Sequence, residues 1–303
     1  MKPMSERKNE GKPHCKRKTR YRAVNPMISS IVAIVLFAVF FVIRNQASKR
    51  YDPGANPPSL GENTAPSVYT PSAADEPTVS TAPSSAYDIV SAFARDHNLQ
   101  MRAWPKELIE LLEKNPDTKD FVLNYPLKKN ETPAIDLSEF ADCRTVPLLF
   151  QWDERWGYHE YAGEMMGTSG CGPTCLSMVC IYLLKNTDYN PKYIAEFSTS
   201  NGYSVPGDGS SWTLISQGGK ELGLDVTEIP LDEDRILRNL EAGNPIICVM
   251  GPGDFTTTGH YIVMTGYIDG KIKVNDPNSK ERSEKLWNYE DIQNQIRNLW
   301  VCR

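Results

Sequence analysis

The chain has 303 residues and a formal net charge of −5, from 33 Lys and Arg against 38 Asp and Glu. The charge is unevenly distributed, because the residues after position 50 hold 21 Lys and Arg against 36 Asp and Glu and carry a net charge of −15. Such an acidic region argues against binding to nucleic acid or anionic lipid. The stretch from Tyr87 onward, about 217 residues, suits one α+β domain.

The N-terminal region predicts a membrane anchor. Residues 27–43 are almost wholly apolar and have the shortest length that spans a bilayer. Residues 1–22 hold nine Lys and Arg against two Glu, so the positive-inside rule predicts that residues 1–26 form a cytoplasmic tail. The apolar run exceeds the apolar core of a typical signal peptide, and Gln46-Ala47-Ser48 is a weak cleavage site. We therefore expect an uncleaved signal anchor.

Residues 44–86 predict a disordered linker, because they are rich in Pro, Ser, Thr and Ala and poor in large apolar side chains. A linker after an anchor with a cytoplasmic N-terminus predicts a single-pass protein of the cell membrane. The domain that follows would lie outside the cell.

Residues 87–142 predict a helical N-terminal extension. The stretches 86–96 and 105–115 have apolar residues at helical spacing, and residues 117–130 continue this pattern. The extension is too small to bury a core alone, so we expect it to pack on the domain at 143–303. Two roles stay open: a segment that occludes a cleft, or a structural brace.

Cys171 lies in the most informative motif, Ser169-Gly170-Cys171-Gly172-Pro173-Thr174. Pro173 suits the first position of a helix, where a missing N–H costs nothing, and the apolar residues 174–184 predict a buried helix. Cys171 would lie beside the unpaired N–H groups and the positive end of that helix. This setting favours the reactive thiolate. The alternative is a small buried residue at a strand-to-helix turn.

His260 opens an apolar segment, residues 260–267, that has strand composition. Asp269-Gly270 predicts a hairpin turn, and the second strand, residues 271–275, ends before Asp276-Pro277. The order Cys171, His260, Asp276 supplies a nucleophile, a base and a carboxylate that orients the base. The alternative for His260 is a core histidine bonded to a backbone carbonyl.

The register of this hairpin is an obstacle to a triad. A strict two-residue turn sets Asp276 opposite Val263, so that His260 and Asp276 face opposite sides. A triad therefore requires an odd-length loop, a bulge, or a bend of Asp276 beyond the ladder. Asn275 and Asn278 are the alternative orienting residues.

The region from about residue 146 to 303 resembles the peptidase C39-like domain, a branch of the papain-like cysteine peptidases. The matching segments are Val146-Pro147-Leu148-Leu149-Phe150-Gln151, Gly170-Cys171-Gly172-Pro173-Thr174, Gly259-His260-Tyr261-Ile262-Val263 and Asn275-Asp276-Pro277. The resemblance implies a papain-like α+β fold, in which a helix with the nucleophile packs on an antiparallel sheet with the base. It implies that Cys171 is the nucleophile, His260 the base and Asp276 the orienting carboxylate. Gln151 and the backbone N–H of Cys171 would then form the oxyanion hole.

Two departures separate this chain from the best-known C39 domains, which cut double-glycine leaders beside a transporter in the cytoplasm. This sequence has no transporter domain, and about twenty residues separate Gln151 from Cys171 where those domains have a few. We therefore do not extend that substrate class to this chain.

The remaining elements and cysteines follow from local signals. Ser210-Ser211 predicts the start of a helix through Leu222, Asp232 caps a helix through Leu240, and residues 244–250 predict a buried strand. Residues 250–253 lack the lysine of a phosphate loop and, like residues 206–209, suit the rim of a cleft. Six cysteines follow the anchor, and a Cys143–Cys302 disulfide is conceivable. Zinc on Cys171, Cys175 and His260 is the rival to a nucleophile, but a second histidine and a second Cys-x-x-Cys pair are missing. We therefore expect no metal and no cofactor.

The sequence thus predicts a membrane-anchored extracellular cysteine peptidase that acts on peptide or protein substrates. Two alternatives stay open. One is a cell-wall peptide hydrolase or transpeptidase with the same triad, and the other is a catalytically inactive papain-like domain that binds peptides.

Overall fold

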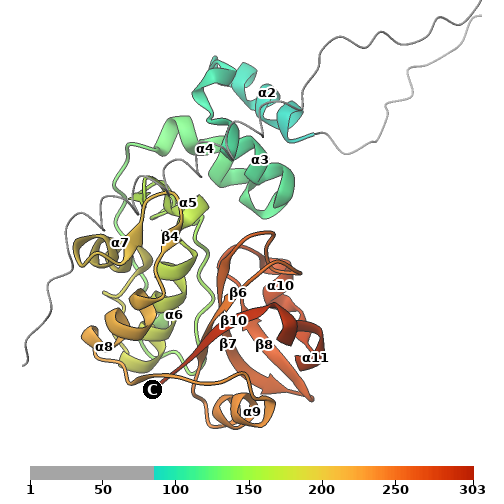
Figure 1. The fold of residues 1–303 in the computed structure, drawn as a ribbon. Coiled ribbons are helices and arrows are strands. Elements are labelled where there is room, and N and C mark those ends of the chain that lie inside the picture. The colour runs from blue at the N-terminus through green and yellow to red at the C-terminus, as the bar shows by residue number, and fades with distance from the viewer. Residues whose placement is uncertain (1–84) are drawn as a thin grey trace, which may run out of the picture. The chain divides into compact units, whose positions relative to one another are not determined.

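The computed structural model describes residues 85–303 (Figure 1). The predicted cytoplasmic tail, the transmembrane segment at 27–43 and the linker up to residue 84 lie outside the described residues. Within residues 85–303, no helix combines the length and the apolar character needed to cross a membrane.

A six-stranded antiparallel sheet forms the centre of the domain, with the strand order β5-β10-β6-β7-β8-β9. Its strands are β5 (Val226–Glu228), β6 (Ile246–Met250), β7 (His260–Ile268), β8 (Lys271–Asn275), β9 (Leu286–Trp287) and β10 (Ile296–Cys302). The predicted α+β class with an antiparallel sheet is confirmed, and the strand predicted within residues 244–250 is β6, which is buried along its whole length.

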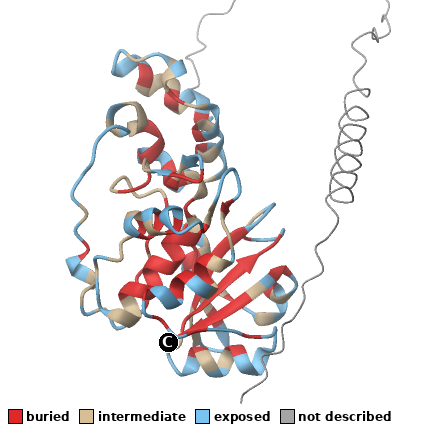
Figure 2. Cartoon of the chain, turned by 60° about the vertical axis from the view of Figure 1, so that its left-hand side comes forward, coloured by how far each residue is buried: buried red, intermediate tan, exposed pale blue. Residues whose placement is uncertain are grey.

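Helix α6 (Cys171–Leu184) packs against one face of this sheet (Figure 1). Alternate residues of β6 and β7, such as Val249 and Val263, share a hydrophobic core with α6. Their neighbours Cys248 and Ile262 point to a second core on the opposite face, which α9 (Glu233–Glu241) covers. Figure 2 shows this arrangement as buried residues concentrated in α6 and the central strands. Because strand side chains alternate between faces, both cores form on the same strands.

The helical extension contains α2 (Ala86–Asp96), α3 (Lys106–Lys114) and α4 (Lys119–Lys128), as the apolar spacing predicts. Ser85 closes a capping box with Asp88 at the start of α2. The three helices share a core that includes Leu108 and Phe121, and residues of the following domain such as Tyr158 pack against it. Short one-turn segments η1 (Met101–Ala103), η2 (Pro116–Thr118) and η3 (Ser138–Phe140) connect or follow these helices.

The predicted helix from Ser210 through Leu222 is wrong at its start. Ser210 instead belongs to β4 (Gly209–Ser210), which pairs with β3 (Ser204–Val205). Its hydroxyl bonds to the Tyr161 hydroxyl at 2.6 Å, and this long-range contact overrides the local capping signal. The helical residues are a π-helical turn, η4 (Leu214–Gly218), followed by α8 (Gly219–Glu221). The cap at Asp232 is confirmed, because its side chain accepts from the N–H of Arg235 at 2.8 Å.

The other elements are short and lie around this framework. They are β1 (Glu160–Tyr161), β2 (Glu164–Met165), α5 (Met166–Ser169), α7 (Pro191–Ser200), α10 (Lys280–Glu284), α11 (Tyr289–Ile292) and η5 (Gln293–Gln295).

The disulfide between Cys143 and Cys302 that the sequence allowed does not form, because all six cysteines within residues 85–303 are free. Cys302 is fully buried at the end of β10, where its thiol points to the carbonyl of Trp300 at 3.8 Å.

Candidate active site

A β-bulge resolves the register of the β7–β8 hairpin. Asp269 and Gly270 have φ values of 52° and 77°, which suit the predicted two-residue turn, and Ile268 pairs with Lys271. The register then shifts between Met264 and Gly266, so that Val263 lies opposite Asn275 and not Asp276. One extra residue in β7 therefore turns Asp276 to the same side as His260.

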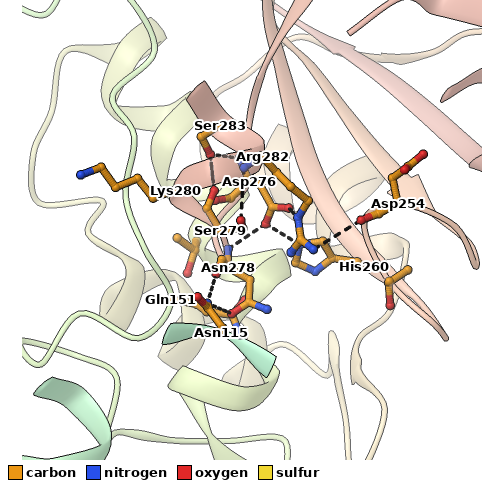
Figure 3. A network of polar contacts seen from close by, with 12 residues as sticks. Asn115, Gln151, Asp254, His260, Asp276, Asn278, Ser279, Lys280, Arg282 and Ser283 are labelled. Carbon is orange, nitrogen blue, oxygen red and sulfur yellow. Dashed lines mark hydrogen bonds and ion pairs between the residues drawn. The ribbon is translucent and has the colours of Figure 1, made fainter. Parts of the chain in front are cut away.

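The Asp276 carboxylate lies between an imidazole and a guanidinium (Figure 3). Its Oδ1 accepts from Nε2 of His260 at 2.8 Å, and its Oδ2 accepts from Nε of Arg282 at 2.6 Å. The N–H of Asn278 also donates to Oδ1 at 2.8 Å. The side chain of Asp276 is fully buried, whereas that of Arg282 is 25% exposed. These donors compensate the buried charge and fix the plane of the carboxylate.

Electrostatics in this network favour a carboxylate beside an imidazolium. Burial raises the pKa of Asp276, but the charge and hydrogen bond of His260, the charge of Arg282 and the N–H of Asn278 outweigh burial and lower the pKa overall. Burial lowers the pKa of His260, but Asp276, together with Cys171, raises it to about 10. Because Nε2 of His260 faces Asp276, Nδ1 is the ring nitrogen left to exchange a proton with a thiol.

Cys171 is the first residue of α6. The helix therefore begins two residues before Pro173, which the sequence predicted as its first residue. Pro173 still lies in the first turn, where its missing N–H leaves no hydrogen bond unmade. Gly172 is required by space, because a Cβ there would lie 2.4 Å from the hydroxyl of Ser210. The absent side chain lets β4 approach the start of α6 beside Cys171.

The thiol of Cys171 differs from the other thiols of the domain. Burial raises its pKa, but interaction with His260 and the N–H groups of Tyr261 and Gly172 outweigh burial and lower the pKa overall. Burial instead raises the pKa of Cys175, Cys180, Cys248 and Cys302. The surroundings of Cys171 therefore stabilise a thiolate, whereas those of the four fully buried thiols disfavour one.

Cys171 and His260 line the same cleft, which has a volume of about 480 Å³. Trp212, which is 48% exposed, forms part of its wall. The predicted rim at residues 206–209 is partly correct, since Gly207 to Gly209 line this cleft. In the loop before His260, Thr258 and Gly259 line the cleft. Residues 253–257 of this loop instead border a second groove, which has a volume of about 920 Å³.

Gln151 is buried close to the same region without lining the cleft. Its Nε2 donates to the carbonyl of Gly167 at 2.9 Å, and its backbone N–H donates to the carbonyl of Pro277 at 2.8 Å. Its Oε1 has no hydrogen-bond partner among the described residues. Gln151 thus connects the segment before Cys171 with the residue after Asp276.

The two alternative orienting residues have other partners. The side chain of Asn275 donates to the carbonyls of Val146 and Pro147 at 3.1 and 3.0 Å, on the side of the α6 core. Asn278 approaches Asp276 through its backbone N–H. Asp276 is the member of this group that the structure brings to His260.

Arg282 and Ser283 are the site residues that sequence reasoning missed. Ser283 is buried and accepts from the N–H of Asp276 at 2.8 Å, while Arg282 contacts the carboxylate. Both lie in α10, which begins after the cap at Ser279. The available clue was the capping signal at Ser279, which lies three residues after Asp276 and three residues before Arg282. Among residues 85–303, no group of three or more His, Cys, Asp and Glu side chains is placed to hold a metal ion.

The fold and these contacts define an α+β domain with a cysteine and a histidine that line one cleft. Residues 143–302 match the model of the Peptidase_C39 like family, and the chain belongs to this family. Membership suggests a cysteine peptidase.

Two solved structures are similar to this chain. The peptidase domain of Streptococcus ComA, a bi-functional ABC transporter involved in a quorum sensing pathway, is 20% identical with a TM-score of 0.38, and the match covers 52% of this chain and 96% of that one. A putative C39-like peptidase from Bacillus anthracis is 14% identical with a TM-score of 0.33, and the match covers 54% of this chain and 95% of that one. No curated protein sequence matches the chain.

Proposed function

We propose that this chain is a membrane-anchored extracellular cysteine peptidase that hydrolyses peptide bonds through Cys171, His260 and Asp276. The observation that carries the proposal is the position of the His260 ring. One ring nitrogen is held by a buried carboxylate at 2.8 Å, and the ring shares a cleft with a thiol at a helix N-terminus. This is the arrangement that acyl transfer by a thiolate requires.

The proposed reaction has two halves. The Cys171 thiolate attacks the scissile carbonyl carbon, and the carbonyl electrons move to its oxygen. When the tetrahedral intermediate collapses, the C–N bond breaks and the leaving amine takes the proton from Nδ1 of His260. Neutral His260 then removes a proton from water, whose oxygen attacks the thioester. Collapse of the second intermediate releases the acid and restores the thiolate–imidazolium pair.

The oxyanion in both halves needs hydrogen-bond donors placed before the reaction begins. The backbone N–H of Cys171 lies in the first turn of α6 and has no helical partner. Nε2 of Gln151 carries two hydrogens, and the contact with Gly167 uses one of them. We assign the second hydrogen to the oxyanion. Asp276 keeps Nε2 protonated, so that Nδ1 carries out the proton transfers.

A peptidyl epoxide, a thiol-directed peptidase inhibitor, tests the assignment of the nucleophile. The full chain in detergent is treated with this inhibitor, and the modified peptide is identified by mass spectrometry. We expect modification at Cys171, loss of labelling in Cys171→Ala and normal labelling in Cys143→Ala, which removes the other half-exposed thiol of residues 85–303. Equal labelling of wild type and Cys171→Ala would refute the assignment. Labelling without peptide hydrolysis would instead favour a peptide-binding domain.

The proposed membrane topology has native reporters, because Cys15 precedes the apolar segment and Cys143 follows it. A membrane-impermeant maleimide applied to intact cells should label Cys143 and leave Cys15 unlabelled until the cells are permeabilised. Labelling of Cys15 in intact cells would contradict a cytoplasmic N-terminus. Recovery of the chain in the soluble fraction would contradict the anchor.

A further inference from the structure

The helical extension contacts the rest of the domain at the loop that follows β8. The side chain of Asn115, between α3 and η2, donates through Nδ2 to the carbonyl of Asn278. Close by, the N–H of Lys280 donates to Asp117 at 3.3 Å. Asn278 is the residue whose own N–H donates to the Asp276 carboxylate (Figure 3). One residue therefore separates the extension from the carboxylate that holds His260.

A second contact leads to Gln151. The ring of Phe121 in α4 abuts the backbone at Gly167, where an added Cβ would lie 2.4 Å from the ring, and at Gly157, where the gap would be 2.6 Å. Tyr158 stacks on the same ring, with the ring centroids 4.6 Å apart. The carbonyl of Gly167 is the acceptor that holds Nε2 of Gln151. Phe121 therefore packs on the backbone that fixes this side chain.

The extension makes these contacts from outside the cleft. In the described part of the chain, the residues that line the cleft all lie between Ala162 and Tyr261. A segment that occludes a cleft has to enter it, whereas these contacts support the cleft from behind its functional side chains.

We propose that the helical extension is a positioning element of the active site, which fixes the Asp276 loop through Asn115 and the Gln151 side chain through Phe121. This inference rests on the proposed function for the roles of Asp276 and Gln151. Asn115 and Phe121 touch neither substrate nor reacting atoms, and they act through the groups that do. A misplacement of about 1 Å in such a support can cost roughly a hundredfold in rate.

Asn115→Ser tests the first contact. Serine keeps a side-chain oxygen for the N–H of Asp117, which donates to Asn115 at 3.2 Å in the wild type. The serine hydroxyl is one atom shorter than the Asn115 amide, so it loses the reach to the carbonyl of Asn278. The matched control is Asn124→Ser, which removes another hydrogen bond from the extension to the domain, to Glu154 at 2.7 Å and away from the site. The readout is the rate of Cys171 alkylation by iodoacetamide as a function of pH, measured by mass spectrometry on the full chain in detergent.

We expect Asn115→Ser to shift the rise of alkylation to higher pH and to slow alkylation at pH 6 roughly three- to tenfold, which is the effect of one lost hydrogen bond. A displaced Asp276 stabilises the imidazolium less, so less thiolate forms. Asn124→Ser should stay within about twofold of the wild type at an equal melting temperature. A wild-type profile in Asn115→Ser, or an equal shift in both variants, would overturn the inference. If Asn115→Ser does not fold, Asn115→Asp provides the same test with the shape retained.

Phe121→Leu tests the second contact, with Phe93→Leu as the control because Phe93 packs within the extension against Trp104. We expect Phe121→Leu to lower kcat for peptide hydrolysis roughly tenfold, with KM and the alkylation profile unchanged, because alkylation forms no oxyanion. An equal loss in Phe93→Leu would refute a specific role. The alkylation readout requires no turnover, so an absence of peptidase activity would contradict the proposed function and still leave the role of Asn115 tested.

Discussion

Asp276→Asn separates the charge of the orienting residue from its shape. The amide keeps an oxygen that can accept from His260 and from the N–H of Asn278, both at 2.8 Å in the wild type. It removes the negative charge and turns an NH₂ group toward Nε of Arg282, which in the wild type donates to the carboxylate at 2.6 Å. Two donors then face each other, so this hydrogen bond is lost. The variant should therefore fold, with a free energy of unfolding lower by about 1.5–3 kcal/mol for the lost charge-assisted bond.

The effect on the thiol follows from the lost charge. An opposite charge within about 4–6 Å moves a pKa by roughly 1–3 units. In Asp276→Asn, the pKa of His260 falls and the pKa of Cys171 rises, because a less stable imidazolium supports less thiolate. The pH range in which the Cys171 thiolate and the His260 imidazolium coexist therefore becomes narrower. The equilibrium constant for forming this ion pair from the neutral thiol and imidazole falls roughly ten- to a thousandfold.

The assay is the pH profile of Cys171 alkylation by iodoacetamide, with peptide mapping to exclude the other thiols. We expect alkylation of the wild type to rise at low pH to a broad plateau, and we expect this rise to lie at higher pH in Asp276→Asn, because less thiolate forms below the ordinary pKa of a cysteine. Asn275→Asp is a poor rescue of this variant, because its side chain faces Val146 and Pro147. An unchanged profile in Asp276→Asn would refute the role of the Asp276 charge.

Two further predictions test other parts of the network. Arg282→Met should raise the pKa of Asp276, because Arg282 lowers it in the wild type. It should also reduce the free energy of unfolding in urea by about 1–2 kcal/mol. A stability equal to that of the wild type would contradict a stabilising role of the Arg282–Asp276 ion pair. The pH dependence of the free energy of unfolding tests the pairing of Cys171 with His260. Between about pH 6.5 and 8.5 these two side chains together carry one proton in both states, on His260 when the protein is folded and on Cys171 when it is unfolded. Their contribution to the free energy of unfolding is therefore independent of pH in this range. In Cys171→Ala the raised pKa of His260 acts alone, so its contribution is complete below about pH 6.5 and is lost as pH rises, by up to about 1.4 kcal/mol per unit. If the free energy of unfolding measured in urea had the same pH dependence in the wild type and in Cys171→Ala, the Cys171 thiol would not be paired with His260.

Local signals predicted the parts of the site that local chemistry determines. The two-residue turn, strand β8 and the helix after Cys171 follow from Asp269-Gly270, Pro277 and the apolar run of α6. The bulge between Met264 and Gly266 has only a weak signal, the isolated Gly266 inside the strand pattern, which often marks a bulge. The sequence therefore showed that a triad needed a register shift, and Gly266 was the available clue to its position.

Long-range contacts account for what the sequence left out. The Arg282–Asp276 ion pair depends on how α10 folds back over the end of β8, and the role of Ser210 depends on Tyr161, which lies 49 positions away. The contact of Asn115 with Asn278 joins residues 163 positions apart. Pairings of this kind come from tertiary structure, and propensity or capping patterns do not reveal them.

The most direct test of the central claim is peptide-bond hydrolysis that depends on Cys171. The full chain in detergent is incubated with a tryptic peptide library, and mass spectrometry identifies new termini. We predict cleavage by the wild type and by Cys143→Ala, and none by Cys171→Ala. Cleavage that persists in Cys171→Ala, or its absence from a wild type whose Cys171 is readily alkylated, would contradict the account.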